Sequence, residues 1–436
     1  MRSKIVTVAT VAASLLFAAQ MAAADEVQEQ LRLMEQRMAE MEDRLQATSE
    51  ELSSARKTVD QQQDMLSEAG LVDEAEDAGF RSAVGEIWDM IDVSGVVAGG
   101  FNYRLVESDI ETGNDGSVAN GGLVGGNSYF KNPNANTFQV NQVWLTVDKT
   151  PTDDSRGGMH FEFITGTAAE AQGASNDGTP YLYSGWASYL APIGNGVQVD
   201  LGRLATPLGA EVVQTNGNYF ITQGNVFALQ PVTHTGVSFS TEIIDGMGFI
   251  FGVVNEVYSD TFVSTDNDKA YYGQFQFGGD NWGLNVGGII GDDDTNATGG
   301  CNGCDTRTSV VDVTATADPT DNLSLWANFD WVHSNGEDFA GHGDALGVSV
   351  AGRLGVTETI GVASRFEYVW SEDTLIGAPD DGEVISLTGT VDKRLTDNLV
   401  SRIELRWDHS LEDNAATFAQ DDEDQLVALW EMFYEF

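Results

Sequence analysis

Hydrophobic and polar residues alternate along most of the chain, from residue 91 to the C-terminus. The alternation comes in segments of about ten residues, separated by clusters of Gly, Asp, Asn, Ser and Thr. Side chains of a strand point to opposite faces in turn, so this pattern predicts strands with one apolar and one polar face. Sixteen strands are predicted, with cores that begin near Ile91, Thr137, Gly157, Leu182, Val197, Val232, Met247, Lys269, Trp282, Arg307, Leu323, Ala345, Ile360, Glu383, Leu399 and Gln425.

The connections between these segments alternate in length. Residues 194–195 and 245–246 form short connections, whereas residues 107–135 and 411–424 form long ones. Outer-membrane barrels have short periplasmic turns and long outer loops, and an even strand number places both barrel ends on the periplasmic side. The pattern therefore predicts an all-β transmembrane fold, a 16-stranded antiparallel outer-membrane β-barrel spanning residues 91–436.

The last segment of the chain is the most regular. Trp430, Met432, Tyr434 and Phe436 occupy alternate positions and would share one apolar face that ends in aromatic residues. An exposed apolar edge strand makes a soluble sheet prone to aggregation, whereas the last strand of a closed membrane barrel pairs with the first and faces lipid. These four residues also resemble the signal that the outer-membrane barrel assembly machinery reads.

Residues 1–24 have the pattern of a cleaved signal peptide. Arg2 and Lys4 precede an apolar run, and three alanines at 22–24 provide the small residues that a signal peptidase requires. An uncleaved anchor helix is the alternative, although polar residues dilute the run. No later segment approaches the roughly 20 consecutive apolar residues of a spanning helix, so the mature chain is expected to be either secreted or a barrel.

Residues 25–68 follow the four-three spacing of a coiled coil. The a positions are Leu31, Met38, Leu45, Leu52, Val59 and Leu66. At 1.5 Å per residue the helix would be about 60 Å long, and its flanking charges favour parallel self-association in the periplasm. A single amphipathic helix that packs on the barrel is the alternative. Gly70 and Gly79 interrupt the pattern, so residues 69–90 are predicted to form a linker.

The chain is strongly acidic, with 21 basic and 68 acidic residues and a formal charge of −47. Loss of residues 1–24 would remove two bases and leave a charge of −49. Such a charge keeps surfaces hydrated and repels anionic polymers, so we do not expect nucleic acid as a partner.

Three of the late strands place charged residues on the face opposite to that of their apolar residues. The lumen-facing candidates are Arg353, Arg365, Glu367, Arg402, Glu404, Arg406 and Asp408. Two of these strands share the spacing Arg-x-Glu-x-x-Trp, which indicates hairpin duplication. In one interpretation the arginines form a basic ladder whose transverse field orients dipolar solutes. In the other, which is equally favoured, the neighbouring acids neutralise them in structural ion pairs.

A distinctive set of residues surrounds the predicted connection 205–231. It comprises Leu201-Gly202-Arg203, Thr206-Pro207-Leu208-Gly209-Ala210-Glu211, Asn218, Pro231-Val232-Thr233-His234-Thr235-Gly236 and Val253-Val254-Asn255. With these residues the chain resembles the beta-barrel porin-2 family of outer-membrane porins, over the barrel from about residue 91 to the end. Glu256 departs from the resemblance, since it follows Asn255 where we would expect Gly. The resemblance implies a passive diffusion pore for small hydrophilic solutes in a Gram-negative outer membrane.

Further expectations follow by analogy with porins. The connection 205–231 is the third outer loop in the predicted order, and in sixteen-stranded porins the third loop folds into the lumen and sets its width. Pro207, Gly209, Glu211 and Asn218 are therefore candidate constriction residues. The heptad helix resembles the periplasmic extension of some sugar and small-acid porins, and porins of this size commonly form trimers. The implied partners are a homo-oligomer, membrane lipid, lipopolysaccharide, the assembly machinery and transported solutes.

The two cysteines lie in a predicted outer loop. Cys301 and Cys304 are expected to form a disulfide, because an exported protein meets an oxidising compartment and two thiols cannot complete a zinc site. Asp292, Asp293 and Asp294 stand nearby and are weak candidates for calcium, with a solvated acidic loop as the favoured alternative. No other cofactor is expected.

The sequence contains no catalytic motif that would indicate an enzyme. Its five histidines do not occur at ligand spacing, and no Gly-x-Ser-x-Gly elbow is present. The main rival to a porin is a structural tether or adhesin that uses the barrel only as an anchor. A helix of about 60 Å with no recognisable wall-binding domain argues against that rival.

Overall fold

The computed structural model describes residues 90–105, 137–171, 180–258, 268–292, 307–335, 343–372, 382–411 and 424–436. The predicted signal peptide, the predicted coiled coil and all but the last residue of the predicted linker lie outside these residues. Cys301, Cys304, Asp293 and Asp294 also lie outside them. The strands all belong to the unit Asp89–Phe436.

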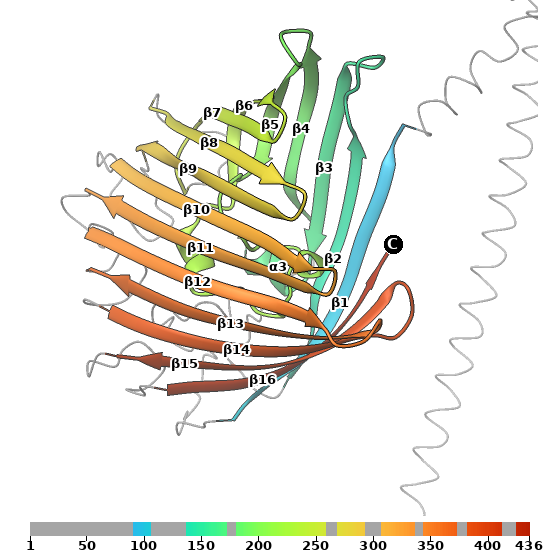
Figure 1. The fold of residues 1–436 in the computed structure, drawn as a ribbon, viewed down its shortest axis with the longest axis vertical. Coiled ribbons are helices and arrows are strands. Elements are labelled where there is room, and N and C mark those ends of the chain that lie inside the picture. The colour runs from blue at the N-terminus through green and yellow to red at the C-terminus, as the bar shows by residue number, and fades with distance from the viewer. Residues whose placement is uncertain are drawn as a thin grey trace, which may run out of the picture. The chain divides into compact units, whose positions relative to one another are not determined.

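The described residues form one closed antiparallel barrel of sixteen strands (Figure 1). Their bounds are β1 (Asp92–Arg104), β2 (Thr137–Lys149), β3 (Gly157–Thr165), β4 (Tyr181–Ala191), β5 (Val197–Ala205), β6 (Thr233–Ile244), β7 (Met247–Val254), β8 (Ala270–Gly279), β9 (Trp282–Asp292), β10 (Arg307–Thr320), β11 (Leu323–Ser334), β12 (Gly343–Gly355), β13 (Ile360–Ser371), β14 (Gly382–Arg394), β15 (Leu399–Ser410) and β16 (Asp424–Glu435). Each strand begins within two residues of its predicted position. The predicted sixteen-stranded antiparallel barrel is confirmed.

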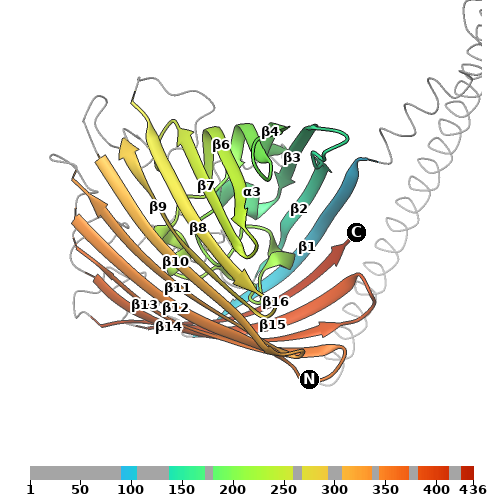
Figure 2. The same cartoon turned by 45° about the horizontal axis from the view of Figure 1, so that its top comes forward.

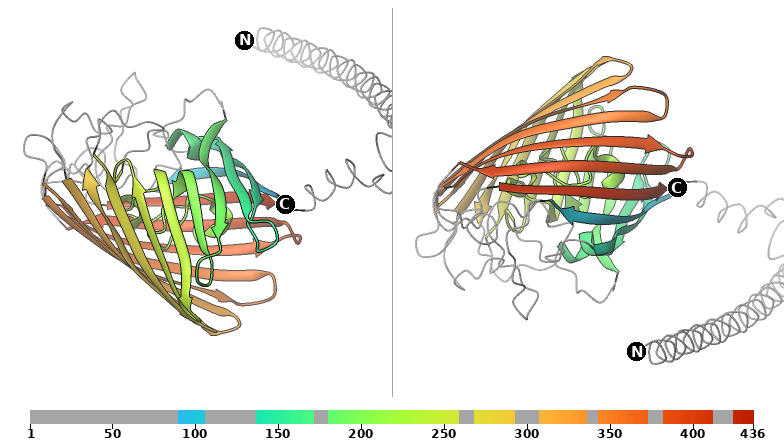
Figure 3. Two further views of the ribbon diagram at one scale, coloured as in Figure 1. Left: turned by 90° about the horizontal axis from the view of Figure 1, so that it is seen from above. Right: turned by 90° about the horizontal axis from the view of Figure 1, so that it is seen from below.

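The barrel closes where the last strand meets the first (Figure 3). Gly95 and Phe436 exchange backbone hydrogen bonds of 3.0 and 3.1 Å at this seam. A Cβ atom at position 95 would lie 2.6 Å from the Phe436 ring, so glycine is needed where the C-terminal ring packs. The last residue of the chain is thus part of the closure and not a loose end.

The barrel wall is apolar outside and polar inside. On β15, Ile403 and Leu405 are 63% and 49% exposed, whereas Arg402, Glu404 and Arg406 are at most 3% exposed. This alternation is typical of a barrel whose outer face contacts lipid. Among the described residues, no helix has the length and hydropathy that crossing a membrane requires.

Short turns join the strands at one end of the barrel. Asp245 and Gly246 link β6 to β7, and Asp321 and Asn322 link β10 to β11. Gly246 has φ +74°, and a Cβ atom there would lie 2.7 Å from the Gly278 carbonyl oxygen, so the tight turn requires glycine. The longer connections leave the strands at the opposite end.

The connection between β5 and β6, residues 206–232, lies inside the barrel (Figure 2). We call it the inner loop. Its buried side chains Leu208, Val226 and Leu229 pack with inward residues of the wall from β7 to β14. Its Ile221 packs with residues of β16. Each such side chain contributes on the order of 1.5–3 kcal/mol when it leaves water, so apolar contacts alone already favour a docked loop.

Candidate functional site

The inner loop carries two short 3-10 helices, η3 (Thr215–Gly217) and η4 (Val226–Leu229), joined by extended segments. Its first residues attach to β8 and β11. Gln274 Nε2 donates to the Pro207 carbonyl at 2.5 Å, and the Ala210 amide donates to Asn328 Oδ1 at 3.0 Å. Between them, Gly209 has φ +94°, and a Cβ atom there would lie 1.9 Å from Gln230 Oε1. Glycine at 209 therefore lets the two ends of the loop approach each other.

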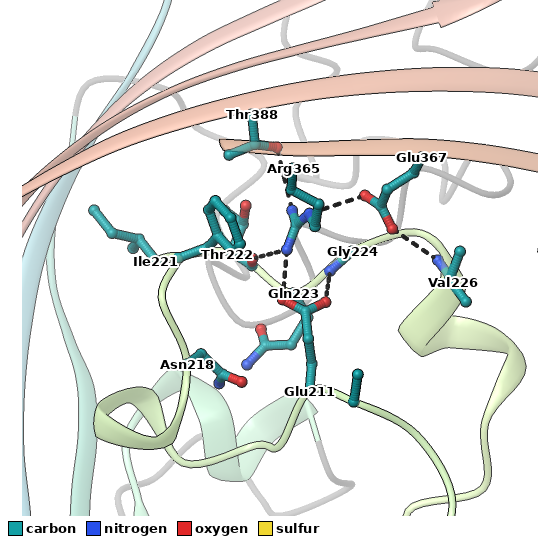
Figure 4. Close-up of polar contacts among 12 residues, drawn as sticks. Glu211, Asn218, Ile221, Thr222, Gln223, Gly224, Val226, Arg365, Glu367 and Thr388 are labelled. Carbon is teal, nitrogen blue, oxygen red and sulfur yellow. Dashed lines mark hydrogen bonds and ion pairs between the residues drawn. The ribbon is translucent and has the colours of Figure 1, made fainter. Parts of the chain in front are cut away.

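Arg365 of β13 is the centre of the contact between the loop and the wall (Figure 4). Its Nη1 donates to Glu211 Oε1 at 2.6 Å and to the Thr222 carbonyl at 2.9 Å. Its Nε lies 3.1 Å from Glu367 Oε2 on the same strand. The guanidinium also lies over the Phe220 ring, 4.6 Å from the ring centroid. Since Arg365 is fully buried, it holds the loop and does not face open water.

Two carboxylates close the network around Gly224. Glu211 Oε2 accepts the Gly224 amide at 2.7 Å, and Glu367 Oε1 accepts the Val226 amide at 3.2 Å. A Cβ atom at position 224 would lie 2.0 Å from Glu367 Oε1 and 2.9 Å from Glu211 Oε2. Only glycine fits between the two carboxylates.

The ionisation of Glu211 reflects this burial. Loss of water raises the pKa of Glu211, the Arg365 guanidinium opposes the rise, and the nearby Glu367 adds to it. The result is a pKa above the ordinary range, which makes the charge state of this loop residue sensitive to acid.

Arg402 of β15 binds the middle of the loop. It donates to the carbonyls of Thr215 and Asn218 at 2.9 and 2.8 Å, and to Glu431 Oε2 at 2.7 Å. Asn218 in turn hydrogen-bonds both the amide and the carbonyl of Val212, at 3.0 and 2.6 Å. The predicted constriction residue Asn218 therefore shapes the loop itself.

Glu404 and Arg406 continue the same arrangement along β15. Glu404 accepts the amides of Ile221 and Thr222 at 2.6 and 3.1 Å. Arg406 donates to the Gln223 carbonyl at 2.7 Å and forms an ion pair of 3.0 Å with Asp408. These charged groups satisfy the polar backbone of a loop that has left water, as burial requires.

The geometry thus corresponds to the second interpretation of the arginines, structural pairing. Arg365, Arg402 and Arg406 are each paired with acids and covered by the loop. Arg353 differs, since its side chain is 36% exposed and binds Asp392 in a bidentate pair with distances of 2.8 and 2.7 Å.

Sequence reasoning missed several residues that hold the loop from β16 and β2, the two strands that flank β1. Glu431 accepts from Asn141 Nδ2 at 2.9 Å and from Thr215 Oγ1 at 2.9 Å. Gln142 binds the loop twice, donating to the Val213 carbonyl at 2.7 Å and accepting the Thr215 amide at 3.0 Å. Glu431 could have been suspected, because it stands at an inward position between the outward residues Trp430 and Met432.

A second missed group lies at the root of the loop. Asp312 and Asp330 face each other across β10 and β11, and both are fully buried. Asn328 Nδ2 donates to Asp312 Oδ2 at 2.8 Å, and Gln230 Nε2 donates to Asp330 Oδ2 at 2.8 Å. Like charges directly opposite on paired strands disfavour the sheet, so their amide partners from the wall and the loop offset this repulsion.

A third missed group lies on the wall formed by β2, β3 and β5. His160 Nδ1 lies 3.0 Å from Asp148 Oδ1, and its Nε2 lies 3.5 Å from Glu162 Oε2. Asp200 accepts from Ser188 Oγ at 2.5 Å and from Gln198 Nε2 at 3.0 Å. We call Asp148, Glu162 and Asp200 the acidic stripe.

The remaining predicted residues lie away from the loop. Trp430, Tyr434 and Phe436 are exposed on the outer face, with Met432 partly exposed between them, so their assembly role stays a prediction. Asp292 is the last residue of β9. Among the described residues, no group of three or more His, Cys, Asp or Glu side chains is placed to hold a metal ion. The disulfide and the calcium site also stay predictions.

The chain matches one family profile and several solved porins. Residues 90–436 match the family described as "Putative beta-barrel porin-2, OmpL-like". The barrel is similar to OmpF of Salmonella typhi (13% identity, TM-score 0.56, 79% of this chain and 97% of that chain). It is also similar to the trimer form of OmpT of Vibrio cholerae (13%, 0.54, 79% and 99%) and to the outer membrane channel DcaP of Acinetobacter baumannii (11%, 0.54, 79% and 97%). No curated protein sequence matches the chain. Since the family profile spans most of the chain, the protein belongs to the beta-barrel porin-2, OmpL-like family.

Proposed function

We propose that this protein is an outer-membrane porin, a water-filled channel through which small hydrophilic solutes and ions diffuse passively. Family membership and the closed barrel with an apolar outer face support an outer-membrane location. A lumen lined with hydrogen-bonded polar and charged groups is the interior that a diffusion pore requires, because such groups replace part of the water around a solute.

The inner loop acts as the constriction in this proposal. The observation that supports it most directly is the ion-pair network that binds residues 206–232 to β11, β13 and β15 inside the barrel. A loop fixed this way narrows the lumen, because the wall already satisfies the charges and backbone polar groups of the loop. Arg365, Arg402 and Arg406 position the constriction, and solutes pass on the side that the loop leaves open.

The proposed roles of the N-terminal segments rest on the sequence alone. Residues 1–24 direct export, and residues 25–68 form a parallel coiled coil that supports a trimer from the periplasmic side. A trimer is in keeping with the similarity to OmpT of Vibrio cholerae, whose solved structure is described as a trimer form.

The rival function, a tether or adhesin, needs the barrel only as an anchor. An anchor gains nothing from a buried network that holds a loop in a defined position within the lumen, so the site geometry favours transport. Planar-bilayer recordings of the purified mature protein distinguish a porin from a tether or adhesin. A porin gives discrete, long-lived conductance steps, whereas an inert anchor gives none.

Shortening the inner loop provides the matched comparison. Removal of residues 212–223, between Glu211 and Gly224, takes away the part bound to Arg402 and Glu404. We expect a larger conductance step than in the wild-type channel, since the obstruction is reduced while the strands remain. An unchanged step would show that the loop does not limit flow.

A further inference from the structure

Water reaches the acids on β2 and β3 but not Arg365 of β13 or Arg406 of β15. The side chains of Asp148 and Glu162 are 32% and 13% exposed, whereas those of Arg365 and Arg406 are fully buried. An ion in the lumen interacts most strongly with charged groups that border its own water-filled path. The accessible charge in the lumen is therefore negative along β2, β3 and β5.

The acidic stripe follows the register of neighbouring strands. Asp148 pairs with His160, which pairs with Trp186, while Glu162 pairs with Ser184. Asp200 stands on the adjoining row, opposite Ser188. The three carboxylates thus share one face of the wall.

Neutral partners surround most of this stripe. Ser184 donates to Glu162 at 2.6 Å, and Asp200 is bound by Ser188 and Gln198. Such groups stabilise a carboxylate but leave its charge in place. A fully protonated His160 would compensate only one of the three carboxylates.

The arginines of β5 and β15 are buried, and the two bases next to the stripe bind other groups: Lys149 binds the Gly157 carbonyl and Arg156 binds Asp153. Within the described strands β2–β5, Arg203 is the one arginine, and it is 3% exposed and stacked over Tyr181, 4.9 Å from the ring centroid. On β15, Arg402 and Arg406 are paired with Glu431 and Asp408. These arginines therefore present little free positive charge to the path.

We propose that the acidic stripe makes the channel cation-selective, with inorganic cations and small protonated amines passing in preference to anions. The stripe, and not the arginine ladder, is then the surface that selects solutes. This inference rests on the proposed function, because selectivity has meaning only if the barrel conducts.

Reversal potentials in planar bilayers under a KCl gradient test the proposal. The wild-type channel is expected to favour K⁺ over Cl⁻. In the triple variant Asp148→Asn, Glu162→Gln, Asp200→Asn, the permeability ratio should fall roughly threefold or more, since three accessible charges are lost. The amides keep the size of the side chains, and the single variant Asp200→Asn serves if the triple variant does not assemble. The preference should also shrink in 1 M salt, where the screening length is about 3 Å.

Asp344→Asn is the matched control. Asp344 is 36% exposed on the outer face beside His333. Its replacement by Asn therefore removes one acidic charge outside the lumen and should leave the permeability ratio of K⁺ to Cl⁻ unchanged. A conducting wild-type channel that favours Cl⁻, or an acid-stripe variant with the wild-type ratio, would overturn the inference and leave the porin function intact. Absence of any conductance would overturn both.

Discussion

Replacing Arg365 by Met removes the centre of the network that holds the inner loop. The substitution keeps a long unbranched side chain but deletes the ion pairs to Glu211 and Glu367 and the hydrogen bond to the Thr222 carbonyl. Both carboxylates are buried and flank Gly224. Without the guanidinium they have no base to compensate them at this site.

The cost of the change can be bounded from proton uptake. A buried carboxylate that loses its partner can take up a proton, and for a glutamate with an ordinary pKa of about 4.3 this costs about 3.7 kcal/mol at pH 7. This cost lies within the range of about 3–5 kcal/mol that is typical for breaking a buried ion pair by removing one partner. The backbone ladder of the barrel does not involve the Arg365 side chain, so the cost falls on loop docking. It would shift the equilibrium between docked and released loop by about 500-fold.

Single-channel recordings can detect such a release. We expect Arg365→Met to produce larger or flickering conductance at pH 7. At pH 5 the cost of protonating a glutamate falls to about 1 kcal/mol, so most of the effect should disappear. The triple change Arg365→Met, Glu211→Gln, Glu367→Gln removes the stranded charges and should restore steadier conductance.

Arg353→Met supplies the control for this experiment. Arg353 pairs with Asp392 where water has access, and exposed pairs contribute only about 0–1 kcal/mol. Its conductance should stay near the wild-type value. If correctly assembled Arg365→Met channels conduct like the wild type at pH 7, the ion pairs do not hold the loop and the reasoning fails.

Three further outcomes are expected. Because the pKa of Glu211 is raised above its ordinary range, protonation favours the docked loop. Acidification from pH 7 towards the ordinary glutamate pKa of about 4.3 should therefore steady or lower conductance, and Glu211→Gln should weaken this dependence. Alkylation without reductant, followed by mass spectrometry, should find Cys301 and Cys304 unmodified; two alkylated thiols would contradict the disulfide. Removal of residues 25–68 should weaken the trimer in native mass spectrometry without abolishing the barrel, and a monomeric full-length protein would contradict the coiled-coil role.

The strands could be predicted from the sequence because each faces two different environments. Lipid outside and a polar lumen inside impose a period of two, and a slip of one residue would bring Arg402 to the lipid face and Ile403 into the lumen. Short turns rich in Gly, Asp, Asn and Thr, such as Asp245-Gly246 and Asp321-Asn322, then mark where the strands end. These constraints act within about ten residues, which is why they can be read without knowing the fold.

The partners of the charged residues could not be predicted in the same way. Arg402 meets Thr215 and Asn218 only because the inner loop crosses the barrel, and no local pattern determines that path. The acidic stripe was missed for another reason. With 68 acids in the chain, one inward acid in a strand is a weak signal until the structure shows whether a base covers it.

The repeated Arg-x-Glu spacing acquires a physical meaning in the folded protein. Residues two apart on a strand share a face and stand roughly 6.7 Å from each other, so an Arg-x-Glu pair presents a donor and an acceptor side by side. On β13, Arg365 binds the Thr222 carbonyl and Glu367 the Val226 amide. On β15, Arg402 binds the carbonyl of Asn218 and Glu404 the amide of Ile221.

A buried loop needs partners for both its backbone amides and its backbone carbonyls, and an Arg-x-Glu pair supplies both at once. The arginines of the ladder therefore bind the backbone of the loop, and in our proposal the acidic stripe on β2, β3 and β5 is the surface that acts on the solute.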